Sequence, residues 1–135
     1  MKTTHFASHV SHKIAELLKQ AGFDWSSIGY YNKLGFFHRA VPQHDELKAP
    51  TIDVAQSWLR TQGYDVTVLA DCDSIGVYYK VYVIYHNSIG YCQKYVKDIG
   101  GYDIGGYGAE IFSDFDKAQE AGIKKALEMI LEEGK

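Results

Sequence analysis

The sequence predicts an α+β fold, with helices packed on one face of an antiparallel sheet of about three strands. Apolar residues recur at helical spacing near both ends of the chain and again after residue 50. Between residues 64 and 86 they alternate with period two instead, as in strands that bury one face. These strand-like segments follow one another closely, which favours antiparallel hairpins. The expected order is helix, loop, helix, three strands and helix, in a single domain over residues 1–135.

The first helix is expected over residues 8–21, which carry one apolar stripe at helical spacing. Gly22 follows this stripe and is typical of a left-handed helix stop. Residues 24–50 show no long periodic element. The aromatic residues on either side of Gly35 predict a short hairpin or an apolar loop packed on the core.

The second and last helices carry clearer boundary signals. Thr51 is a good N-cap for the second helix, and Gly63 repeats the glycine stop. Ser113 and Asp116 have the spacing of a capping pair ahead of a long apolar stripe. We therefore expect the last helix to begin at Ser113 and to end at Gly134.

Three strands are expected between these helices. Residues 64–70 and 77–85 predict a hairpin, with turn chemistry between them that includes Asp71 and Asp73. Residues 91–97 predict a third strand at a sheet edge, because neither of its faces is clearly apolar. The tandem repeat DIGGY that follows predicts a mobile loop, since four of its ten residues are glycine.

The long central strand has two faces of different chemistry, and nine of the eleven tyrosines lie in this half of the chain. One face is predicted to form core, and it carries Val77, Tyr79, Val81, Val83 and Tyr85. The other is aromatic and amphipathic, and it carries Tyr78, Lys80, Tyr82, Ile84 and His86. This second face is either held out for a partner or covered by residues 24–50, and the sequence leaves both alternatives open.

Composition limits the classes of partner. A net charge of −3 argues against general affinity for nucleic-acid backbones or anionic membranes. No run approaches the roughly 20 apolar residues of a membrane span, and the amino-terminal residues do not resemble a signal peptide. Cys72 and Cys92 lack metal-ligand spacing and are expected to be free thiols. A cytoplasmic location is the expectation.

Candidate ligand residues have simpler structural interpretations. His5, His9 and His12 would share one exposed face if the first helix extended that far back, but no second group is placed to support a metal. The glycine pairs of the DIGGY repeat do not form a phosphate-binding motif. No metal and no cofactor are expected.

Three functions remain as hypotheses. The first is a non-enzymatic protein that binds another protein or itself through the tyrosine-rich face. The second is a weak nucleic-acid module that stacks bases on Tyr78 and Tyr82, although the last helix opens with carboxylates rather than lysines. The third is an enzyme centred on Cys92 and His86, for which no orienting third group is evident.

Three segments carry a resemblance over about the whole chain: APTIDVAQSWLR (residues 49–60), FDKAQEAGIKKALEMI (residues 115–130) and LLKQAGFDW (residues 17–25). In these segments the sequence resembles a group of small uncharacterised proteins of Bacteroides-type gut bacteria and their phages or mobile elements. The resemblance implies no catalytic residues and no known ligand, and it does not account for the DIGGY repeat.

Overall fold

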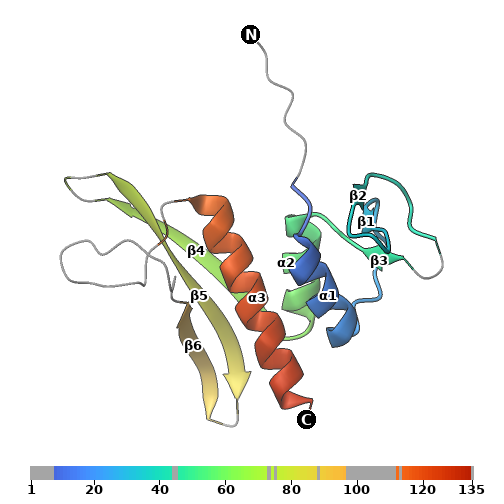
Figure 1. Cartoon of the computed structure of the whole chain (residues 1–135). Coiled ribbons are helices and arrows are strands. Elements are labelled where there is room, and N and C mark those ends of the chain that lie inside the picture. Colours follow the sequence, from blue (N-terminus) through green and yellow to red (C-terminus); the bar gives the residue numbers. More distant parts are fainter. Residues whose placement is uncertain are drawn as a thin grey trace.

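The computed structural model describes residues 8–43, 46–72, 74, 76–87, 89–96, 112 and 114–134. Within these ranges, three helices and two three-stranded antiparallel sheets confirm the α+β class. The larger sheet lies on one side of the helices and the smaller sheet on the other (Figure 1). The predicted DIGGY loop lies outside the described residues.

Helix α1 spans His12–Ala21, so the expectation that it starts at residue 8 is wrong. Ser11 caps it, since its side chain accepts a hydrogen bond from the first turn. The preceding residues are extended because the Val10 N–H donates to the Pro50 carbonyl at 2.9 Å. The predicted stop is confirmed at Gly22, whose φ of 94° is left-handed.

Helix α2 spans Ile52–Thr61 and confirms the sequence expectation closely. Thr51 is its N-cap, and Gly63 follows its end with φ of 91°. Its buried stripe consists of Ile52, Ala55, Trp58 and Leu59. The ring of Trp58 meets that of Phe23 edge-on at 5.5 Å, which joins α2 to the segment after α1.

Helix α3 spans Phe115–Glu133 and ends at Gly134 as predicted. Its N-cap is Asp114 rather than Ser113, because the Asp114 carboxylate accepts from the Asp116 and Lys117 N–H groups at 2.8 and 3.2 Å. A carboxylate at this position also meets the positive end of the helix dipole. The N-cap therefore lies one residue later than predicted, and the predicted reciprocal capping pair does not form, because Lys117 at the third helical position has no acceptor atom.

The larger sheet has the order β4 (Tyr64–Cys72), β5 (Val77–Asn87) and β6 (Gly90–Val96), so the predicted hairpin and edge strand are confirmed. Asp71 pairs with Tyr78 inside the hairpin, so its predicted place in the turn is wrong. Helix α3 packs on β4 and β5 (Figure 1). We call this the inner face of the sheet. Val66 of β4 is buried on it, as are Val81 and Val83 of β5, which the sequence predicted to be core. Val77, also predicted to be core, is 60% exposed because it lies at the end of β5. The opposite surface is the outer face.

The smaller sheet is built by residues of the 24–50 segment. Strands β1 (Tyr30–Tyr31) and β2 (Phe37–His38) form the predicted hairpin, and β3 (Leu47–Lys48) pairs with the other side of β1. The Tyr31 hydroxyl donates to the Val10 carbonyl at 2.8 Å, which fixes this sheet to the start of α1. The small sheet lies beside α1, far from the larger sheet (Figure 1).

Candidate functional site

The outer face of the larger sheet is the surface on which the predicted contact residues lie. Because side chains alternate along β5, the residues opposite the buried valines are Tyr78, Lys80, Tyr82, Ile84 and His86. None of the helices or other strands in the described ranges packs on this face (Figure 1). The alternative that residues 24–50 cover it is wrong for the described part of that segment, since the helices stand between them.

The five predicted residues differ in accessibility. His86 is exposed, and Tyr78, Lys80 and Ile84 are half-buried. Tyr82 is only 9% exposed, although it does not belong to the core cluster. It occupies the middle of the central strand, with Thr67 opposite on β4 and a β6 residue on the other side. Tyr82 therefore offers little contact area in this structure.

Strand register adds two residues that the sequence analysis missed. Tyr91 lies opposite His86 on β6, is 84% exposed, and meets the His86 ring edge-on at 5.0 Å. Leu69 lies opposite Lys80 on β4 and is half exposed. Pairing across strands, rather than position along one strand, brings these side chains to the same face.

The charges on the outer face have both signs. Asp65 lies opposite Ile84, and Asp71 lies opposite Tyr78, so two carboxylates share the face with Lys80. A phosphate backbone laid across this sheet would meet both carboxylates. The charge distribution of the outer face therefore suits a protein partner better than a nucleic-acid partner.

The predicted pair of Cys92 and His86 does not come together. Cys92 lies opposite Tyr85, a residue of the inner face, whereas His86 belongs to the outer face. Residues directly opposite each other on paired strands share a face of the sheet, and the next residue along either strand lies on the other face. Cys92 and His86 are offset by one position in this way. Cys72 stands at the other end of the sheet, and both cysteines are free thiols. A dyad formed by Cys92 and His86 is excluded.

His9 and His12 do not share a helix face. His9 precedes the N-cap of α1, and its Nδ1 lies 2.7 Å from the Ala49 carbonyl oxygen, with its ring edge-on to Phe37. His12 pairs with Glu16 at 2.8 Å. His9 is thus a packing residue rather than a surface one, and His5 lies outside the described residues. Among those residues, no cluster of three or more His, Cys, Asp or Glu side chains could hold a metal ion.

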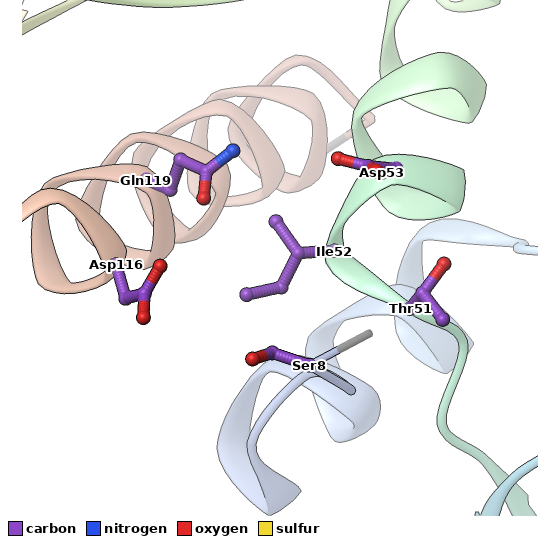
Figure 2. A pocket seen from close by; sticks show the side chains of 6 residues that line it. All are labelled: Ser8, Thr51, Ile52, Asp53, Asp116 and Gln119. Atoms are coloured by element: carbon purple, nitrogen blue, oxygen red, sulfur yellow. The ribbon is translucent and has the colours of Figure 1, made fainter. Parts of the chain in front are cut away.

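A small cavity of about 130 Å³ lies where α2 and α3 begin (Figure 2). Its polar lining includes Asp53 and Asp116, each in the first turn of its own helix. Carboxylates at these positions stabilise the helix ends, so they need no ligand. Binding pockets for cofactors start at roughly 300 Å³, and this cavity is too small for one.

Glu120 lies next to that region and has a perturbed carboxyl group. Its partial burial, and secondarily the nearby carboxylate of Asp116, raise its pKa above the usual range. The Ser11 N–H donates to it and opposes this rise. The carboxylate thus bonds the start of α1 to α3, which is a structural role.

A second apolar surface, which the sequence analysis did not predict, lies on the β1–β2 hairpin. Leu34 and Phe36 at its tip are 81% and 65% exposed. The Asn32 Oδ1 accepts from both of their N–H groups, at 2.9 and 3.0 Å, and holds the tip in one conformation. This tip is remote from the outer face (Figure 1).

Comparison with known proteins finds no matching family model, no match among the curated proteins and no match among the solved structures. The resemblance of residues 17–25, 49–60 and 115–130 to proteins of Bacteroides-type bacteria stays a prediction. None of the helices in the described ranges combines the length and the apolar character that a membrane crossing requires.

Proposed function

We propose that this chain is a non-enzymatic protein-interaction module that binds through the outer face of its larger sheet. One observation carries this proposal: all described helices lie on the inner side of the sheet, while the outer side presents aromatic side chains. An antiparallel sheet commonly leaves one face to solvent, but that face is then usually polar. Here it carries Tyr78, Tyr91, Leu69 and Ile84.

The chemistry of this face suits a protein partner. Tyrosine gives a large contact area for few rotatable bonds, and its hydroxyl needs no burial. Lys80 and His86 supply polar groups between the apolar residues, as in the mixed composition of protein interfaces. Binding of nucleic acid by stacking on Tyr78 stays a weaker candidate, because Asp65 and Asp71 lie on the same surface.

The test compares the proteins captured by the tagged full chain with those captured by its Tyr78→Ser variant. Truncation of a tyrosine at the centre of an interface, where binding energy concentrates, costs about 2 kcal/mol or more, so we expect capture of the specific partner to fall about tenfold or further. Quantitative mass spectrometry of the captured proteins measures this ratio. Nuclease treatment of the lysate excludes capture through nucleic acid.

Leu34→Ser is the control, because it removes a large apolar side chain, 81% exposed, from the remote hairpin tip. It should retain every protein that Tyr78→Ser loses. If Tyr78→Ser captures the same proteins as the unsubstituted chain, or if Leu34→Ser alone loses them, the outer face is not the binding surface.

A further inference from the structure

Hydrogen bonding identifies the edge of the larger sheet to which no other described strand is paired. Tyr79 of β5 exchanges both backbone hydrogen bonds with Phe112, each at 2.7 Å, on the side away from β4. Backbone groups along a strand alternate in direction, so every second residue from Tyr79 points toward β6. The β6 residues that face β5 are therefore Cys92, Lys94 and Val96. Those whose N–H and C=O groups point outward are Tyr91, Gln93 and Tyr95.

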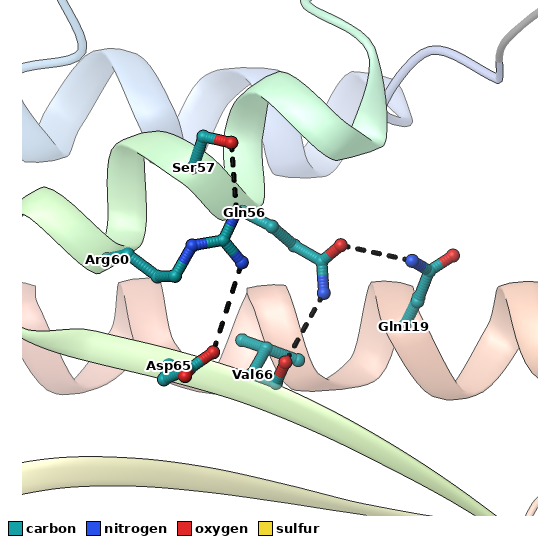
Figure 3. A network of polar contacts seen from close by, with 6 residues as sticks. All are labelled: Gln56, Ser57, Arg60, Asp65, Val66 and Gln119. Carbon is teal, nitrogen blue, oxygen red and sulfur yellow. Dashed lines mark hydrogen bonds and ion pairs between the residues drawn. The ribbon is translucent and has the colours of Figure 1, made fainter.

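The two edge strands of this sheet, β4 and β6, differ in their hydrogen bonds to neighbouring elements. On the β4 edge, the Gln56 side chain of α2 donates to the Val66 carbonyl at 3.4 Å (Figure 3). The side-chain amide of Gln119 on α3 donates to the side-chain oxygen of Gln56 at 3.0 Å. Arg60 of α2 lies 4.0 Å from the Asp65 carboxylate on the same strand. Helix α2 thus covers β4. In the described ranges, no backbone or side-chain hydrogen bond reaches the outward edge of β6. A seven-residue strand of this kind can accept another strand.

We propose that β6 pairs antiparallel with β6 of a second copy of this chain, which joins the two sheets into one of six strands. This inference rests on the proposed function, because the dimer would join the outer faces of two copies into one larger binding surface. The sequence of β6 favours a second copy over an unrelated strand. Residues 91–95 read Tyr-Cys-Gln-Lys-Tyr. At the three positions whose backbone groups point to the open edge, this sequence is symmetric: a tyrosine stands two residues before Gln93 and another two residues after it.

The symmetric register places Gln93 opposite Gln93 of the second copy. Position 91 then lies opposite position 95 of the second copy, so the hydrogen-bonding backbone groups of both edges meet in pairs. The one charged residue of the strand is Lys94, which falls opposite Cys92 of the second copy. Two lysines directly opposite each other are therefore avoided, and the pairing carries no like-charge penalty in this register.

The helices leave room for this arrangement. Helix α3 packs mainly across β4 and β5 and makes only a small contact with β6, so most of β6 separates it from the joining edge in each copy. Four strand spacings of about 4.8 Å would place the two α3 axes roughly 19 Å apart. Packed helices approach to about 8–10 Å, and the two copies of α3 do not collide.

The experiment is sedimentation velocity of the full chain over a range of concentrations, with the Gln93→Lys and Gln93→Glu variants alone and mixed. The unsubstituted chain should form a dimer of twice the 15.2 kDa of one chain. Each variant alone places like charges opposite each other at the symmetry axis, so its dimer Kd should rise about tenfold or more. An equimolar mixture places opposite charges there and should restore the dimer.

Val41→Lys is the control, because Val41 is 71% exposed and lies outside the larger sheet, so the added charge should leave the dimer Kd unchanged. Because Gln93 is exposed, the variants should remain folded, and circular dichroism checks this. A chain that stays monomeric at every concentration, or a dimer that neither Gln93 variant weakens, overturns the edge pairing. The proposed function fails separately, when Tyr78→Ser changes no captured protein while the dimer persists.

Discussion

Gly122→Leu is expected to abolish cooperative folding of this protein. Gly122 lies in the middle of α3, and a Cβ atom placed on it would clash with Val66 Cγ1 and stand 2.7 Å from Val81 Cγ2. Both contacts are far shorter than carbon atoms tolerate, and both valines are buried on the inner face. A leucine side chain would force α3 off the sheet. Urea unfolding followed by near-ultraviolet circular dichroism should show no cooperative transition.

Gly122→Ala gives the graded version of this result. Alanine favours a helix by about 1 kcal/mol over glycine, but forced overpacking in a core costs about 1–3 kcal/mol. We expect a net loss in the free energy of unfolding. Gly134→Ala is the control at the C-cap of the same helix, since its Cβ would meet its nearest atom at an ordinary 3.7 Å. If Gly122→Ala raised stability as a plain helix substitution does, the close packing of α3 on the sheet would be wrong.

Trp58→Ala is expected to lower the free energy of unfolding by about 3–5 kcal/mol. The Trp58 side chain is 2% exposed and is the largest of the fully buried side chains in the described ranges. It fills the space between α2 and Phe23, and alanine would leave a cavity there. For a domain of marginal stability this loss is a large share of the total. Equilibrium urea denaturation measures it.

Trp58→Phe separates the cavity from the loss of any one contact. Phenylalanine keeps a ring that can face Phe23, so the expected cost is less than half that of alanine. Equal costs for the two substitutions would mean that the indole ring contributes by something other than volume. Trp25, which is 37% exposed, provides an external reference, and Trp25→Ala should cost far less.

Local signals predicted those parts of the fold that depend on nearby residues. Helix α2 has its cap at Thr51 and its glycine at position 63, and both boundaries were predicted from residues within the helix or next to it. The start of α1 was mispredicted, because residues 8–10 pair with residues 50–52, about 40 positions away. The spacing of apolar residues within a helix carries no information about such a distant pairing. The pairing takes up backbone hydrogen-bonding groups that an earlier helix start would need.

The role of the 24–50 segment was only partly predictable. Its turn chemistry around Gly35 predicted the hairpin, but β3 joins that sheet from a separate part of the segment. Its position beside α1 decides that it does not cover the outer face. That position depends on contacts such as the Tyr31 hydroxyl to the Val10 carbonyl, which no local pattern encodes.

The candidate surface was predicted by alternation on β5 alone, so it lacked the residues supplied by neighbouring strands. Register with β4 and β6 adds Leu69 and Tyr91. Accessibility of Tyr82 could not be predicted, because burial in a central strand depends on what lies on either side of it. Register also excludes the pairing of Cys92 with His86, which their spacing in the sequence had left open.

The most direct test of the binding role of the outer face is photocrosslinking from the position of Tyr78. A photoreactive phenylalanine analogue in place of Tyr78, in the full chain expressed in cells, should form a covalent adduct with another protein chain on illumination. The same analogue in place of Leu34 should not form that adduct. Adducts from Tyr78 that are absent, or that match those from Leu34, would contradict the role proposed for the outer face.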